Sequence, residues 1–454
     1  MATTIIPGGE NTFAAQLAAA TAETARIAAE TARDTALSTV PSDNTLALRS
    51  AIRNYGIMAS PAHRLEAANV ATITVGGSSS AINSNNSSNC NVSRTSSKLQ
   101  WPSGPGALGG AFGTANVPRG SWDGSAYGHT TYNAVEFSHN GSTFEIPVHG
   151  SGASGTNFRV LVNDTEAGTS VFTATGSIYY VKVTFPSSKV RRIRIETAGV
   201  PIYGVNVSST TEVSNPNRAY PLAAIMGDSF VEGTGTVLNG IGSEATLMGR
   251  LLGWDIALAG LGGTGILNPA SSPTKVNFAD TTRLLDLTLS GVTDARTGAA
   301  VDPKIGVVMV SLNDNGYTSW STFEPSATSF QYAITRRVYR IIDAWAATRN
   351  GKPLVFFGPT NSSSNSPPLD LFRIRDGVQE AVFGFGGASQ NVWFIDRFAP
   401  GPVLRQGIYT TSTDQAFLYT AGSGDPTHPN QAGHNLDGIW MAQQLRSLIL
   451  TEFN

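Results

Sequence analysis

The sequence lacks the features that would tie the protein to a disulfide scaffold, a nucleic acid or a membrane. Its 454 residues include a single cysteine, Cys90, which excludes an internal disulfide and a cysteine-rich metal site. Charged residues make up 14% and the formal net charge is −2, so there is no electrostatic reason to expect nucleic acid or an anionic membrane as a partner. No stretch approaches the roughly 20 apolar residues of a membrane span. We therefore expect a soluble protein with a neutral partner, held together by packing alone.

The beginning of the sequence also lacks the basic start and apolar run of a secretion signal. If the protein acts outside the cell that makes it, we expect it to leave by another route, such as lysis. Residues 12–38 are rich in alanine, and the motif of residues 22–26 returns at 29–33, which predicts a helix with a thin coiled-coil seam. Because such a helix is marginal alone, we expect residues 1–58 to be an oligomerising stalk or attachment segment. A helix lying on its own domain, or frayed in solution, is the alternative.

Residues 59–217 are rich in glycine, serine and asparagine and contain short alternating runs. Apolar and polar residues alternate at 158–163, 181–185 and 192–196, with turn-rich pieces between them, which predicts an all-β sandwich-like domain. Four aromatic residues of this region could stack on sugar rings, with ordinary packing as the alternative. These residues are Trp101, Trp122, Tyr127 and Tyr132.

Residues 218–454 alternate between buried strands and amphipathic helices. Continuous apolar runs, typical of parallel strands, occupy 222–226, 254–259, 305–310, 354–357 and 392–395. Helical patterns lie around 244–252, 331–347 and 435–450. This order predicts a three-layer α/β domain with a parallel sheet, and its functional residues should lie at the carboxyl edge of the sheet.

Four short sequence blocks carry candidate functional residues. Three of them follow predicted strands, and the fourth precedes the last predicted helix. Ser229 stands in Gly-Asp-Ser after the first strand, where a strand-to-helix turn can expose its hydroxyl, although a serine there could equally cap the helix. Asp425 and His428 stand in Asp-Pro-Thr-His, so the carboxylate can reach the imidazole and orient it as a base. The other histidine after Ser229, His434, is interpreted as a packing or capping residue.

Two further blocks can donate hydrogen bonds to an oxyanion. One is the glycine-rich segment 260–265 after the second strand, and the other is Ser311-Leu312-Asn313-Asp314 after the third. A glycine N–H can approach a substrate closely, and an asparagine amide is a neutral, directional donor.

The four blocks, in this order and position, resemble those of the SGNH (GDSL-type) hydrolases over about residues 219–450. The resemblance implies that Ser229 is the nucleophile, with His428 and Asp425 completing the triad. It also implies an oxyanion hole made of the amides of Ser229 and Gly263 and the side chain of Asn313. One position departs from the pattern, because Ser311 stands where the family usually has glycine, which puts the close backbone packing there in doubt.

Other interpretations of the same residues are weaker. Segment 260–265 also satisfies the dinucleotide pattern G-x-G-x-x-G, but a proline-containing stretch follows it where a phosphate-binding helix would start. His428 and His434 lack a third ligand at metal spacing, so we expect no metal and no cofactor. A non-catalytic receptor-binding or structural protein on an SGNH scaffold is the rival from another class.

The surroundings of the blocks suggest a substrate and a setting. The loop of residues 361–366 is small and polar, which favours a short acyl group on a hydrophilic carrier over a lipid. A heptad helix, a β-domain and an SGNH domain together resemble a bacteriophage tail fibre or tailspike esterase. That resemblance implies a homo-oligomer, favoured as a trimer, that binds other virion tail proteins and removes O-acetyl groups from host surface polysaccharide. A bacterial polysaccharide or xylan acetyl esterase is the alternative.

Overall fold

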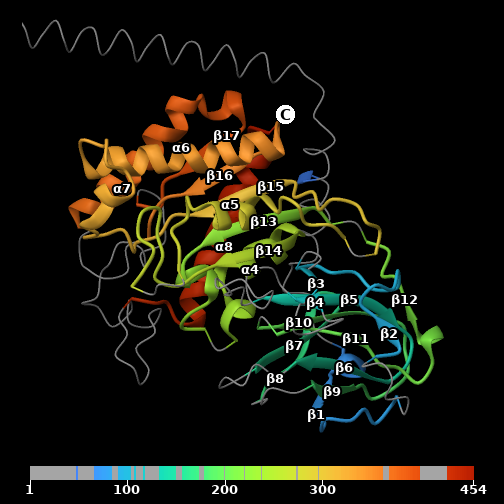
Figure 1. Cartoon of the computed structure of the whole chain (residues 1–454). Coiled ribbons are helices and arrows are strands. Elements are labelled where there is room, and N and C mark those ends of the chain that lie inside the picture. The colour runs from blue at the N-terminus through green and yellow to red at the C-terminus, as the bar shows by residue number, and fades with distance from the viewer. Residues whose placement is uncertain are drawn as a thin grey trace, which may run out of the picture.

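The computed structural model describes two parts of the chain, an antiparallel β part and an α/β part (Figure 1). The described residues are 48–49, 66–83, 90–103, 107–108, 116–117, 132–149, 156–172, 178–198, 200–218, 220–236, 238–271, 275–294, 296–360, 368–398 and 427–453. The helix expected at residues 12–38 lies outside them. None of the helices in the described ranges is long and apolar enough to cross a membrane.

The β part is a sandwich of two antiparallel sheets, as the alternating runs predict. One sheet has the strand order β1-β9-β6 and the other β12-β5-β10-β7-β8. The bounds are β1 Thr72–Val75, β5 Asn133–His139, β6 Thr143–His149, β7 Thr156–Val162, β8 Thr165–Phe172, β9 Ile178–Thr184, β10 Arg191–Thr197 and β12 Val213–Ser214. Inward side chains of both sheets, such as Phe137 and Val181, share one hydrophobic core. Two short strand pairs flank the sheets: β2 (Val92–Ser93) with β11 (Gly204–Val205), and β3 (Ala107–Leu108) with β4 (Asn116–Val117).

Two of the four aromatic residues suggested for sugar stacking are core residues. Trp101 is 6% exposed and donates its indole N–H to the carbonyl of Arg94 at 3.1 Å. Tyr132 is 1% exposed and its hydroxyl lies 3.1 Å from Glu196. Protein covers both rings, so the stacking interpretation is wrong for them and the packing alternative is correct. Trp122 and Tyr127 lie outside the described residues.

The α/β part contains one parallel sheet with the order β14-β13-β15-β16-β17. Its strands are β13 Leu222–Gly227, β14 Asp255–Gly260, β15 Ile305–Met309, β16 Leu354–Phe357 and β17 Val392–Ile395. Successive residues of a strand point to opposite faces, so these uniformly apolar runs need helices on both sides. The result is the three-layer α/β fold that the sequence predicts.

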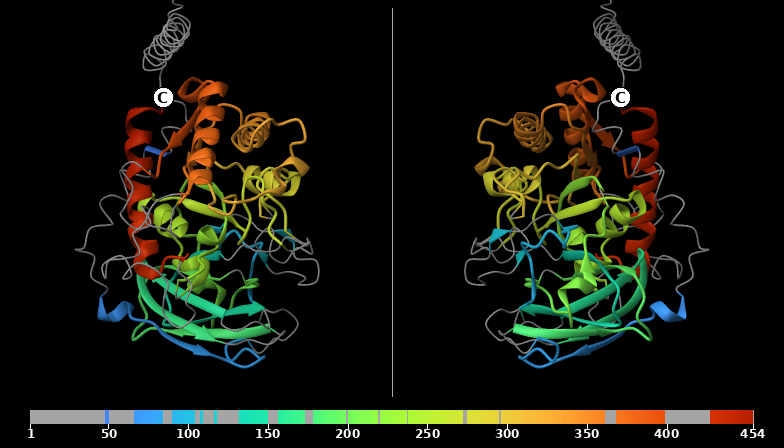
Figure 2. Two further views of the ribbon diagram at one scale, coloured as in Figure 1. Left: turned by 90° about the vertical axis from the view of Figure 1, so that its left-hand side faces the viewer. Right: turned by 90° about the vertical axis from the view of Figure 1, so that its right-hand side faces the viewer.

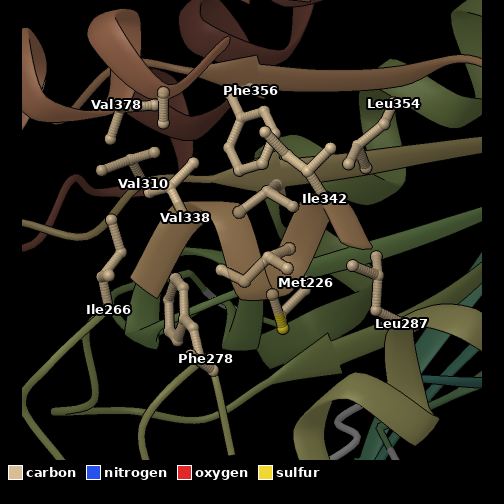
Figure 3. Packing of buried hydrophobic residues seen from close by; sticks show 14 of the residues in the cluster. Met226, Ile266, Phe278, Leu287, Val310, Val338, Ile342, Leu354, Phe356 and Val378 are labelled. Carbon is tan, nitrogen blue, oxygen red and sulfur yellow. The ribbon is translucent and has the colours of Figure 1, made fainter. Parts of the chain in front are cut away.

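Helices cover the two faces of the sheet unequally. Helices α4 (Glu244–Leu252) and α8 (Gln431–Thr451) pack on one face, and the two views in Figure 2 show α8 running along that side. Helices α5 (Thr281–Thr288), α6 (Phe330–Arg349) and α7 (Leu369–Phe385) cover the other face. There Met226, Val338 and Phe356 meet in the buried cluster shown in Figure 3.

The predicted strands and helices of this part are confirmed to within a few residues at their ends. Two helices were not anticipated, α5 and α7. Helix α7 carries a signal that could have revealed it, because Leu371, Ile374, Val378 and Ala381 are buried at spacings of three and four after Pro368.

Buried charges join the two parts of the molecule. Arg159 of β7 ion-pairs with Glu196 of β10 and also donates to the carbonyl of Ile241 in the α/β part at 2.9 Å. Burial would raise the pKa of Glu196, but the guanidinium groups of Arg159 and Arg194 outweigh it and lower that pKa to about 2. The polar face of β10 therefore packs against the α/β part, so both faces of this strand are buried.

Candidate active site

Ser229 lies at the carboxyl edge of the sheet, directly after β13. It is the first residue of the short helix α3 (Ser229–Glu232), whose N-cap is Asp228, because the Asp228 carboxylate accepts the N–H of Phe230 at 3.0 Å. The capping role considered for Ser229 thus belongs to its neighbour. Glycine is needed beside this turn, since a Cβ on Gly260 would lie 2.6 Å from the backbone nitrogen of Glu232.

His428 reaches Ser229 from the segment just before α8. Its Nε2 atom lies 2.8 Å from Ser229 Oγ, although 199 residues separate the two in the chain. The ring of Phe230 lies beside the imidazole, with a centroid separation of 5.6 Å. Ser229 is 7% exposed and His428 is half-buried. Asp425 lies outside the described residues, so its role as the orienting carboxylate stays a prediction.

Gly263 and Asn313 come from the loops after β14 and β15, on either side of β13. Gly263 is half-buried and has φ +80°, a left-handed conformation that favours glycine. The amide nitrogen of Asn313 donates to Asp228 at 3.2 Å and to the carbonyl of Thr264 at 3.1 Å. The side-chain amide of Asn313 thus already has two protein acceptors, so donation to an oxyanion would require one of them to share its hydrogen bond.

Ser311 stands where the family pattern usually has glycine. Its hydrogen bonds connect the turn of Asp228 and Ser229 to the segment that contains Asn313. Its hydroxyl donates to Asp228 Oδ2 at 2.6 Å and accepts the backbone N–H of Asn313 at 2.8 Å. The side chain is buried within this network, so the packing remains close. Burial raises the pKa of Asp228, and the hydrogen bond from Ser311 opposes that rise.

Asp314 organises the loop that contains Gly263, a role that sequence reasoning did not assign. Its buried carboxylate accepts the backbone N–H groups of Ile266, Leu267 and Asn268 at 2.6, 2.9 and 2.8 Å. Burial raises the pKa of Asp314 to about 6 against the effect of these three bonds. Asp314 thus fixes the backbone that directly follows the glycine-rich segment.

Glu232 and Lys275 also contact this loop, and sequence reasoning missed both. Glu232 accepts the N–H of Gly262 at 2.8 Å, and Lys275 Nζ donates to the carbonyl of Gly262 at 2.5 Å. Burial raises the pKa of Glu232, while the charge of Lys275 opposes that rise. Glu232 could have been suspected, because it lies three residues after Ser229 and thus near it on the helix. Lys275 carries no such signal.

His434 is a packing residue, as interpreted from the sequence. It is fully buried, with Nε2 3.0 Å from the carbonyl of Thr234 and Nδ1 3.2 Å from Glu244. Burial alone would raise the pKa of Glu244, but the hydrogen bond from His434 and the charge of Arg397 bring it below its usual value. This network fixes the start of α8, and with it the segment that carries His428. Within the described ranges, no three histidine, cysteine, aspartate or glutamate side chains gather as metal ligands would.

The sequence matches no protein-family model and no curated protein, but the fold is similar to solved structures. One is a family two carbohydrate esterase from Clostridium thermocellum in complex with cellohexaose, with TM-score 0.51, 14% identity, and 71% of this chain and 94% of that chain covered. Another is the salicylyl-acyltransferase SsfX3 from a tetracycline biosynthetic pathway, with TM-score 0.50, 13% identity and coverages of 80% and 98%. A third is the acetyl xylan esterase Est2A from the rumen bacterium Butyrivibrio proteoclasticus, with TM-score 0.50, 13% identity and coverages of 78% and 99%. The chain therefore shares its fold, a three-layer α/β part with an additional β part, with these two esterases and the acyltransferase.

Proposed function

We propose that the protein is a serine esterase that removes short acyl groups, chiefly O-acetyl groups, from carbohydrate. The observation that carries this proposal is the 2.8 Å contact between Ser229 Oγ and His428 Nε2 at the carboxyl edge of the parallel sheet. A hydroxyl becomes an effective nucleophile when a base within hydrogen-bond reach can take its proton.

The proposed reaction has two halves. In the first, His428 Nε2 takes the Ser229 proton while Oγ attacks the ester carbonyl. The amides of Ser229 and Gly263 and the side chain of Asn313 stabilise the oxyanion, and each such donor is commonly worth on the order of 10²–10³ in kcat. The imidazolium then protonates the departing sugar oxygen. In the second half, His428 deprotonates water, which attacks the acyl-enzyme, and Ser229 leaves with the proton. Asp425 would hold the tautomer in which Nε2 is unprotonated.

A carbohydrate substrate is supported by the similar structures and by the composition of one segment of the sequence. A family two carbohydrate esterase and an acetyl xylan esterase share the fold. Segment 361–366 lies outside the described residues, and its small, polar composition favours a hydrophilic carrier over a lipid. Host cell-surface polysaccharide is the substrate we propose, and a bacterial polysaccharide or xylan acetyl esterase is the alternative.

The setting that we propose is a phage tail, in the virion or otherwise outside the cell. Its support is the heptad pattern in residues 12–38, which would assemble a trimer and join other tail proteins. Native mass measurement tests the assembly. We expect a trimer that becomes a monomer when residues 1–40 are deleted, and a full-length monomer at micromolar concentration would contradict the stalk.

Hydrolysis assays test the activity itself. We expect hydrolysis of p-nitrophenyl acetate and release of acetate from acetylated polysaccharides, and a fall of at least about 10⁴-fold in kcat for Ser229→Ala. Equal, slow release by both proteins would overturn the enzyme proposal. If both proteins also bind the polysaccharide equally tightly, the non-catalytic binding protein becomes the better account.

A further inference from the structure

Side chains from two other parts of the chain hold the two peptide units on either side of Gly262. The N–H of Gly262, which belongs to the preceding Leu261–Gly262 peptide, donates to the carboxylate of Glu232, one helical turn after Ser229. The carbonyl of Gly262 is bound by the ammonium of Lys275 at 2.5 Å. Lys275 is half-buried, so this contact is partly shielded from water.

The carbonyl of Gly262 and the N–H of Gly263 belong to the same planar peptide. In a trans peptide these two groups point in opposite directions, so whatever fixes the carbonyl also fixes the N–H. Neither residue has a side chain, and Gly263 has φ +80°. Glycine tolerates both signs of φ, so the local sequence would let this peptide turn over at little cost. A turned peptide would present a carbonyl oxygen where a donor is needed.

We propose that Lys275 is a positioning residue for the oxyanion hole, which holds the Gly262–Gly263 peptide with its N–H directed toward the reacting carbonyl. The proposal rests on the proposed esterase function. Glu232 assists by anchoring the preceding peptide to the nucleophile's own helix. Lys275 contributes a charge-assisted bond, which is stronger than a neutral one, and its charge also polarises the peptide so that the Gly263 N–H becomes a better donor.

Kinetics of Lys275→Met tests this role, since methionine has a similar length but no donor. Oxyanion donors act mainly in the transition state, so we expect kcat for p-nitrophenyl acetate to fall about 10- to 100-fold while KM changes less than about twofold. Lys275→Arg can still donate to the carbonyl and should recover most of the rate. The matched control is Lys304→Met, which removes a lysine that pairs with Asp302 on the surface and should leave both constants unchanged. A rise in KM at constant kcat would overturn the proposal, because Lys275 would then bind substrate instead.

Crystal structures of the parent and of Lys275→Met provide a readout that does not depend on activity. We expect the Gly262–Gly263 peptide to turn over in the variant, at least in part of the molecules, while Ser229 and His428 stay in place. An unmoved peptide would overturn the positioning role whatever the rate. If the parent protein hydrolyses no ester, the proposed function fails, and the two crystal structures still decide whether Lys275 fixes the peptide.

Discussion

Replacing Ser311 with alanine removes one hydroxyl that makes two buried hydrogen bonds. Its bond to the Asp228 carboxylate is 2.6 Å long, and a bond of this charged kind contributes about 1.5–3 kcal/mol. The N–H of Asn313 loses its acceptor as well, which costs about 1 kcal/mol. We therefore expect the free energy of unfolding to fall by about 3 kcal/mol at neutral pH.

The loss should depend on pH, and the pKa of Asp228 gives its sign. Burial already raises this pKa above the usual 3.8, and the Ser311 hydroxyl opposes that rise. In the variant the pKa rises further. A carboxyl whose folded-state pKa exceeds its unfolded value makes stability fall as pH rises between the two values. The alanine variant should therefore lose more stability at pH 8 than at pH 4.5, where more of Asp228 is protonated.

Urea denaturation of parent and variant at these two pH values measures the effect. Ser326→Ala is the control, because Ser326 is an exposed serine outside the network and its loss should cost less than about 0.5 kcal/mol. A loss below about 1 kcal/mol for Ser311→Ala, or an equal loss at both pH values, would refute the reasoning.

Two other substitutions and one labelling experiment have defined outcomes. Asp314→Asn turns an NH₂ group toward at least one of three backbone N–H groups, so we expect about 2–4 kcal/mol less stability in urea, and a fully stable variant would contradict this. Arg397→Met removes the buried guanidinium that pairs with Glu244 and Asp437, which should cost about 3–5 kcal/mol; unchanged thermal unfolding would contradict that interaction. Burial raises the pKa of Cys90 to about 12, so Ellman's reagent should label it only after denaturation, whereas rapid labelling of the native protein would show an accessible thiolate.

Local sequence pattern determined the architecture and the principal candidates of the site. Uniform apolar runs predicted β13 to β17, because a strand buried on both faces needs apolar side chains in succession. Ser229, Gly263 and Asn313 each follow such a run, and parallel strands bring their carboxyl ends to one edge of the sheet. The meeting of Ser229 with His428 at that edge follows from this order of elements.

Only the tertiary structure decided which other side chains support these groups. Lys275 contacts the Gly262 carbonyl through a loop whose course no periodic pattern specifies, and Ser311 binds Asp228 from a different strand. The alternation in β10 revealed one apolar face but not that Arg194 and Glu196, on the other face, are buried against the α/β part. Periodicity reports the conformation of a segment, whereas burial and pairing depend on which distant segment packs against it.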